Sequence, residues 1–175
     1  PLRETMLVRG DIDAITGFSF TSMLNLEARG IKTEDIVVMP FADNGVKLYG
    51  NAIIVSPKML KENGPAVKAF LAAFAKGAKE VMVNPAAAIG VVKERDGIIN
   101  VALETRRLQM AIDAVVASPD ARKEGFGRIN DARMALMASQ VSDAYKTKNR
   151  VDVKAVWDGS AMPDAATLDI LPKKK

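Results

Sequence analysis

Two turn-rich stretches of this 175-residue chain hold the residues best suited to binding chemistry. The first reads Gly17-Phe18-Ser19-Phe20-Thr21-Ser22, a glycine turn followed by hydroxyl residues where a strand is expected to give way to a helix. Free backbone N–H groups at such a position form a site for an anion or a carbonyl group. Simple helix capping by Ser19, Thr21 or Ser22 explains the same residues. The stretch matches neither a phosphate-binding loop nor a dinucleotide-binding fingerprint.

The second stretch combines turn residues, amides and one aromatic ring. It reads Asp43-Asn44-Gly45 and continues, after three residues, with Tyr49-Gly50-Asn51. Between two expected strands, such a segment suits the floor or the hinge of a cleft. An ordinary loop beside an edge strand explains it equally well.

Charged residues elsewhere favour a structural role. Asp11 and Asp13 share a side of an extended segment, as a metal or acid–base pair would, but turn residues between a helix and a strand are the simpler interpretation. Glu104, with Arg106 and Arg107, favours a salt bridge or a solvated helix face. With 0 Cys and 0 His, the chain alone builds no thiol nucleophile, Cys/His zinc site or Ser-His-Asp triad. We therefore expect no catalytic residue, no metal and no cofactor.

The elements that must position these residues read as α/β at the front and as helical afterwards. Apolar runs predict short strands at 13–16, 36–39 and 48–55, and the β-branched run at 36–39 is typical of a strand buried in a parallel sheet. A parallel sheet needs more strands than these, so we expect the others to precede Pro1. Helical signals predict helices at 5–8, 22–29, 58–62, 65–83, 86–94, 101–116 and 131–145. The remainder, 151–175, reads as irregular with a further short strand at 153–156.

Apolar spacing also predicts which helix faces are buried. For the predicted helices at 65–83 and 131–145 the stripes are Val67, Phe70, Leu71, Phe74, Ala78 and Val81, and Met134, Met137, Val141 and Tyr145. Trp157 either plugs the body of the protein or stacks on a ligand.

Composition narrows the class of protein. The net charge is +4, but three lysines end the chain, so a basic face for nucleic acid is disfavoured. No apolar run reaches the ~18 residues of a membrane span. The opening Pro1-Leu2-Arg3-Glu4 is no signal peptide, and we expect a fragment or a processed product. The absence of Cys fits an exported protein that needs no disulfide.

From Arg9-Gly10-Asp11-Ile12-Asp13-Ala14 to Phe18, the chain resembles the substrate-binding proteins of ABC importers. It is most similar to their NMT1/THI5-like branch, which serves the uptake of nitrate, sulfonates, taurine and pyrimidines. The order and spacing of further segments carry the resemblance over nearly the whole chain. They are 41–51, 54–58, 66–71, 76–77, 84–89, 103–104 and 125–129.

The resemblance implies an incomplete α/β fold of the type II periplasmic-binding-protein kind, in which two lobes close on a ligand. Residues 1–45 would end the second lobe and form the crossover, and residues 46–175 would be the helix-rich carboxyl-terminal part of the first lobe. Ligand binding would be weak without the amino-terminal half. The predicted ligand-binding residues are Thr16, Gly17, Phe18, Ser19, Asp43, Asn44, Tyr49 and Asn51.

The resemblance also implies a function. We expect a periplasmic solute-binding component of an ABC importer, without catalysis, which captures a small anionic or heteroaromatic ligand and docks on a membrane permease. A homodimer through an exposed sheet edge is a further expectation. Two alternatives remain open. One is a THI5-like enzyme of thiamine-pyrimidine synthesis, whose pyrimidine donor is a His; the other is the effector-binding domain of a transcription regulator.

Overall fold

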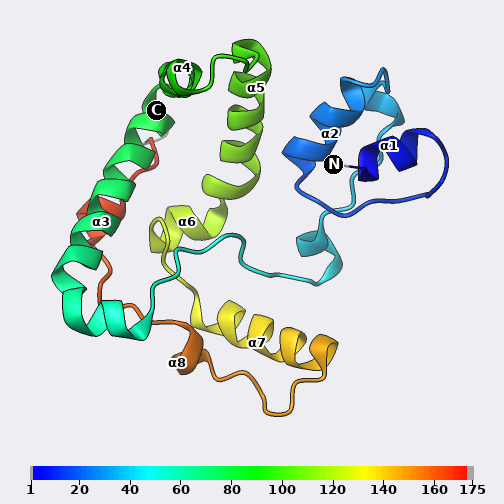
Figure 1. The fold of residues 1–175 in the computed structure, drawn as a ribbon. Coiled ribbons are helices and arrows are strands. Elements are labelled where there is room, and N and C mark those ends of the chain that lie inside the picture. Colours follow the sequence, from blue (N-terminus) through cyan, green and yellow to red (C-terminus); the bar gives the residue numbers. More distant parts are fainter. Residues whose placement is uncertain (1, 173–175) are drawn as a thin grey trace. The chain divides into compact units, whose positions relative to one another are not determined.

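Helical periodicity dominates the sequence, and the computed structural model follows it over residues 2–172, the part of the chain that the structure describes (Figure 1). Its α-helices are α1 (Arg3–Val8), α2 (Ser19–Glu27), α3 (Pro57–Val83), α4 (Pro85–Arg95), α5 (Val101–Ala111), α6 (Pro119–Glu124), α7 (Asp131–Tyr145), α8 (Val153–Val156) and α9 (Ala165–Leu168). Two 3-10 turns, η1 (Thr33–Asp35) and η2 (Phe41–Asn44), and a π-helical turn, η3 (Ile112–Val116), complete the described elements.

Side-chain caps set several helix starts. The hydroxyl of Ser56 accepts a hydrogen bond from the backbone N–H of Met59 at 3.1 Å, and Pro57 follows as the first helical residue. The side chain of Asn130 accepts from the N–H of Arg133 at 3.0 Å and opens α7. These starts agree within one residue with the helices predicted to begin at 58 and 131. The cap predicted for α2 at Thr21 or Ser22 is wrong, because that helix begins at Ser19.

The predicted α/β fold is wrong for the described residues, which contain no β-strand. A strand is stabilised by hydrogen bonds to a neighbouring strand, and the segments at 13–16, 36–39 and 48–55 have no such partner between residues 2 and 172. Their apolar side chains are accordingly exposed, to 84% for Val37 and 91% for Ile54. The predicted strand at 153–156 is the helical turn α8, which Asp152 caps. Because there is no sheet in this range, the predicted homodimer through a sheet edge is also wrong.

The described chain divides into two compact units. Unit 1 comprises the residues up to Met39 together with Pro85–Ala114, and unit 2 comprises Pro40–Asn84 together with the residues from Val115 on. In unit 1, α2 packs on α1 and α5, and α5 packs on α4; its buried apolar residues are Leu24, Leu26, Ile89 and Ile112. The assignment of residues 1–45 and 46–175 to two lobes stays a prediction.

The core of unit 2 forms where α3 meets α9 and the segment after it. Ala75, Leu168 and Ile170 are its fully buried members. Six partly buried residues pack against them: Ala78, Met82, Val116, Phe126, Met162 and Leu171. The burial of a helix that the sequence left unassigned, α9, thus completes this core. No helix between residues 2 and 172 is both long and apolar enough to cross a bilayer.

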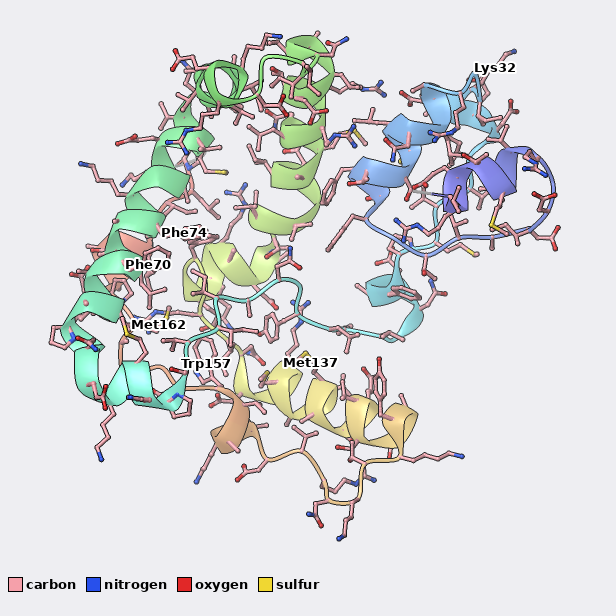
Figure 2. The ribbon with its side chains drawn as sticks, viewed as in Figure 1. Lys32, Phe70, Phe74, Met137, Trp157 and Met162 are labelled. Carbon is pink, nitrogen blue, oxygen red and sulfur yellow. The ribbon has the colours of Figure 1, made fainter. Side chains whose placement is uncertain are left out.

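The two predicted buried stripes are only partly correct. On α7 the buried residues are Met134, Ala138 and Ser142, four residues apart, while Tyr145 is exposed. On α3, Val67 and Ala75 are buried. Phe70 and Phe74 are only partly covered and stack on each other with ring centroids 6.4 Å apart (Figure 2). Phe74 also stacks on Phe126, with ring centroids 6.2 Å apart. Short side chains therefore make the close helix contacts, and larger ones lie beside them.

Candidate functional site

The start of α2 leaves two backbone N–H groups without an acceptor among the described residues. Phe18, which precedes the helix, has an extended backbone (φ −79°, ψ 127°), and its side chain makes no capping hydrogen bond. Its carbonyl oxygen accepts from the N–H groups of Thr21 and Ser22, both at 3.0 Å. Those of Ser19 and Phe20 are left unpaired. Residues 16–22, which we call the α2 corner, therefore present partial positive charge.

Two side chains of α1 hold the α2 corner in place. Arg3 donates through Nη1 to the carbonyl oxygen of Thr16 at 2.6 Å. The hydroxyl of Ser22 donates to Oε1 of Glu4 at 3.1 Å, and Glu4 is only 2% exposed. Both ends of the corner are thus tied to one short helix, which fixes its shape before any ligand arrives.

Gly17 is required by the closeness of these groups. A Cβ atom at this position would lie 2.9 Å from Oγ of Ser22 and 3.3 Å from the guanidinium nitrogens of Arg3. Any larger residue must displace the hydroxyl that Glu4 holds. The sequence predicts a turn at Gly17, and the structure shows that this glycine also allows the α2 corner to pack closely.

The Glu4 carboxyl is ionised at neutral pH. A hydrogen bond from its own backbone N–H is the main cause that lowers the pKa of Glu4 from its usual value of about 4.5, and the Ser22 hydroxyl and the charge of Arg3 lower it further. Burial opposes these effects. Arg3 Nη2 lies 3.9 Å from the carboxylate, so the buried negative charge has a cation beside it.

Aromatic faces lie next to the free N–H groups. The rings of Phe18 and Phe20 stack with centroids 5.2 Å apart and an interplanar angle of 21°, and Phe18 is 46% exposed. An exposed ring beside two amide donors suits a planar or compact ligand that carries a negative or carbonyl oxygen.

Helix α5 supports α2 through one ion pair, Arg106 with Glu27, and through hydrogen bonds from Arg107 to backbone carbonyl groups of α2. Arg107 Nε pairs with Glu104 at 3.0 Å, and its Nη1 lies 3.4 Å from the carbonyl oxygen of Phe20. Arg106 pairs with Glu27 through both guanidinium nitrogens, one of them at 3.0 Å. The salt bridge predicted at Glu104 is confirmed.

In unit 2, the predicted residues of the second stretch form a tight turn. The amide of Asn44 donates to the carbonyl oxygen of Pro40 at 3.0 Å, and Gly45 ends the turn at φ 85°. Gln140 of α7 donates to the carbonyl oxygen of Gly45 at 2.9 Å. Asp43 and Asn51 are exposed. Asn44 thus stabilises its own loop, as the simpler interpretation of this turn requires.

Tyr49 is bound from several sides by the protein itself. Its hydroxyl accepts from the backbone N–H of Asn130 at 2.7 Å. Its own N–H donates to the sulfur of Met137, a residue labelled in Figure 2, at 3.3 Å. The guanidinium of Arg133 lies over the ring, 4.3 Å from its centroid. We call these four residues the Tyr49 cluster.

Arg133 joins this cluster to its surroundings. Its Nε donates to the carbonyl oxygen of Lys47 at 3.1 Å, its Nη2 to that of Leu48 at 2.7 Å, and its Nη1 pairs with Asp120 at 2.6 Å. The two backbone positions before Tyr49 are thereby fixed to α7.

The eight predicted ligand-binding residues fall into both units. Thr16, Gly17, Phe18 and Ser19 come together in unit 1, and Asp43, Asn44, Tyr49 and Asn51 belong to unit 2. A shared cleft lined by both groups stays a prediction. Asp11 pairs with Arg9 at 3.3 Å. No group of three or more His, Cys, Asp or Glu side chains arranged to hold a metal ion occurs among the described residues.

Sequence reasoning missed the residues that hold the two groups. Arg3 and Glu4 precede the α2 corner by 13 and 12 positions, and Arg133 follows Tyr49 by 84 positions in the numbering of the chain. The residue types of α1, two charged residues followed by a threonine and three apolar residues, give no signal for a buried carboxylate. These partners are distant in the sequence and meet only in the folded structure, so residue spacing alone does not predict their contacts.

Comparison with known proteins identifies a family. Residues 3–88 match the family model described as NMT1/THI5 like, which confirms the resemblance over that range. All eight predicted ligand-binding residues and the whole α2 corner lie within the matched range. Neither the curated proteins nor the solved structures give a significant match to the chain.

Proposed function

We propose that this chain, of which residues 3–88 belong to the NMT1/THI5-like family, is the solute-binding component of an ABC importer. It captures a small anionic or heteroaromatic ligand without changing it chemically. In this role it works in the periplasm and delivers its ligand to a permease in the membrane. The family includes both binding proteins and THI5 enzymes, so the choice between them rests on the residues of the site.

The α2 corner is the observation that carries the proposal. The free N–H groups of Ser19 and Phe20 point to an oxygen acceptor, and the exposed ring of Phe18 offers a flat apolar face. Hydrogen bonds from a helix start bind anions with the help of the helix dipole. The buried ties to Arg3 and Glu4 keep the donors in place, which lowers the cost of binding.

The residues at the corner favour binding over catalysis. Its own side chains are hydroxyls and phenyl rings, and the neighbouring Arg3 of α1 already donates to a carbonyl group. The THI5-like enzyme needs a His as pyrimidine donor, and the 175 residues contain 0 His. A binding protein needs only the donors and apolar faces that the corner supplies.

The proposal can be tested by removing a single N–H group. Ser19 is the first residue of α2, a position where proline is well accepted, and Phe18 before it has the extended backbone that proline requires. The chain itself begins α3, α4 and α6 with proline. Ser19→Pro therefore removes one donor and keeps the helix start. Ser19→Ala is the matched control, because it removes only the hydroxyl.

Calorimetric titration with nitrate, taurine and a methylated aminopyrimidine gives the readout. We expect weak, saturable binding of at least one of these by the unaltered chain. Loss of one hydrogen bond to a charged group costs about 1.5–3 kcal/mol, so Ser19→Pro should weaken binding of an anion about tenfold or more, and Ser19→Ala much less. Equal affinities of the two variants for a bound anion would show that the N–H groups do not recognise it.

A further inference from the structure

A groove in unit 2, separate from the α2 corner, runs between α7 and the segment that contains α8. It is open to solvent and has a volume of about 660 Å³. This volume lies within the range of about 300–1,000 Å³ that is typical of small-molecule sites. Its apolar lining consists of Ile129, Ala135, Ala138, Val151, Val153 and Trp157. Trp157, labelled in Figure 2, is the only tryptophan of the chain.

The walls of the groove are held by hydrogen bonds rather than by a filling side chain. The buried hydroxyl of Ser142 donates to the carbonyl oxygen of Ala138 at 2.7 Å and accepts from the N–H of Val151 at 2.9 Å. Asp152 accepts from the N–H of Lys154 at 3.0 Å and so begins α8, which packs on α7. The alanines on α7 leave the space between these walls open.

A cationic hollow adjoins the groove. It encloses about 410 Å³ and shares Ser142 and Arg150 with the groove. Its lining carries three cations, Lys146, Lys148 and Arg150, against one carboxylate, Asp143. Arg150 pairs with Asp143 at 2.7 Å. No carboxylate of the described residues lies within ion-pair distance of either lysine.

The two lysines are presented by a defined backbone. Lys146 ends α7 in the left-handed conformation (φ 48°), and the hydroxyl of Thr147 donates to the carbonyl oxygen of Asn149 at 2.7 Å. The groove itself is balanced in charge, because its lining contains two carboxylates, Asp131 and Asp152, beside Arg150 and Lys154. The preference for an anion therefore comes from the hollow at its end.

We propose that the groove and the hollow together bind a small amphiphilic anion, a single apolar body that carries one carboxylate or sulfonate. The body lies between Ala135 of α7 and the indole of Trp157, and the anionic group lies beside Lys146 and Lys148. The apolar surface of the groove is complementary to the apolar body of such a ligand, and the unpaired cations of the hollow are complementary to its anionic group. A molecule with only one of these two parts would match only part of the site. The site uses no residue of the α2 corner, so a test of this site does not depend on whether the proposed importer function is correct.

The fluorescence of Trp157 reports directly on this site. We would titrate the full chain with octanoate and with octanesulfonate, both below their micelle concentrations. Octanol supplies the body without charge, and methanesulfonate supplies the charge without the body. Both eight-carbon anions should shift the Trp157 emission to shorter wavelength in a saturable manner. Octanol and methanesulfonate should require at least tenfold higher concentrations, and added salt should weaken the binding of the anions.

Two pairs of surface variants locate the site. Ala135→Phe fills the groove, whereas Ala132→Phe places the same ring on another exposed position of α7. Lys148→Glu reverses a charge in the hollow, whereas Lys61→Glu reverses one on α3. Ala135→Phe should weaken octanoate binding about tenfold or more, and Lys148→Glu about fivefold or more. Each control should stay within a factor of two of the unaltered chain, and circular dichroism establishes that every variant keeps its helix content.

Several results would overturn the proposal. Octanol that is as effective as octanoate would show that the hollow recognises no charge. Equal effects of Ala135→Phe and Ala132→Phe, or of Lys148→Glu and Lys61→Glu, would place binding elsewhere. A response to vesicles of anionic phospholipid without any response to the free octyl anions would assign the surface to a membrane instead.

Discussion

Replacement of Arg133 by methionine should loosen the part of unit 2 that holds Tyr49. Arg133→Met keeps most of the apolar stem of the side chain, so it removes the guanidinium without leaving a large cavity. The lost interactions are two hydrogen bonds to backbone carbonyl groups, the ion pair with Asp120 and the contact with the Tyr49 ring. These interactions join α6, α7 and the segment at 47–49. Their loss should therefore lower the free energy of unfolding of unit 2.

The magnitude follows from the exposure of the partners. The Arg133 side chain is 26% exposed and that of Asp120 is 45% exposed, so the ion pair contributes at most about 1 kcal/mol. Each hydrogen bond to an exposed carbonyl group contributes about 1 kcal/mol, and the cation–ring contact about 0.5–1 kcal/mol. Arg133→Met should therefore lower the free energy of unfolding by about 2–4 kcal/mol. Arg133→Lys keeps the positive charge but not the planar guanidinium group, so it should retain about half of the stabilisation that Arg133 supplies.

Urea unfolding followed by Trp157 emission measures this change, because the tryptophan lies in the same unit. The matched control is Arg122→Met on α6, an exposed arginine. The control should change the free energy of unfolding by less than about 0.5 kcal/mol. If Arg133→Met and Arg122→Met unfold at the same urea concentration, Arg133 does not tie Tyr49 to α7.

Two further predictions concern unit 1. Gly17→Ala should destabilise the unit by about 1–3 kcal/mol in thermal unfolding, because the new Cβ displaces the Ser22 hydroxyl from Glu4. Because the folded-state pKa of Glu4 is lowered, the stability it supplies is present above its usual pKa of about 4.5 and is lost as the pH falls through the lower folded value. Glu4→Gln should flatten this part of the stability curve, measured as the melting temperature between neutral pH and pH ~3.

Each of these predictions has a control within the chain. Gly50→Ala adds a Cβ where no atom lies within 4 Å, so it should leave the melting temperature almost unchanged. A Gly17→Ala protein that is no less stable than Gly50→Ala would mean that the α2 corner is loosely packed. For Glu4, an unchanged acid dependence in Glu4→Gln would assign the loss of stability to other carboxylates.

Local chemistry predicted the helices well. Asn130 and the Ser56-Pro57 pair mark helix starts through interactions within one turn, so the sequence shows them directly. The helix at 101–116 was predicted in full, and its last turn is π-helical rather than α-helical. Nothing in the residue types of that turn distinguishes the two hydrogen-bond patterns.

The predicted strands failed because a strand depends on a partner outside its own segment. The run Ile36-Val37-Val38-Met39 has the composition of a buried strand, yet the side chain of Met39 is 74% exposed. Apolar β-branched residues indicate a preference for extended backbone, and Ile36 has such a backbone (φ −100°, ψ 112°). Composition does not reveal whether a second strand is at hand within the same chain.

The candidate site was predicted in part. The glycine turn and the hydroxyl residues that begin α2 are visible as a pattern, and they lie together in unit 1. The roles of Arg3 and Arg133 depend on contacts between segments far apart in the sequence, which no spacing rule reveals. The sequence predicts Tyr49 as a ligand-binding ring, and its contacts with Asn130 and Arg133 give it a structural role as well.

The most direct test of solute binding at the α2 corner is a nuclear magnetic resonance titration of the isotopically labelled chain with nitrate, taurine and a methylated aminopyrimidine. We predict that the amide signals of Ser19 and Phe20 move in a saturable manner with at least one of these ligands, and that they move further than the amide signals of the other helix starts. Amides that stay fixed at Ser19 and Phe20 with all three ligands, up to concentrations at which signals elsewhere in the chain respond, would contradict the proposed function.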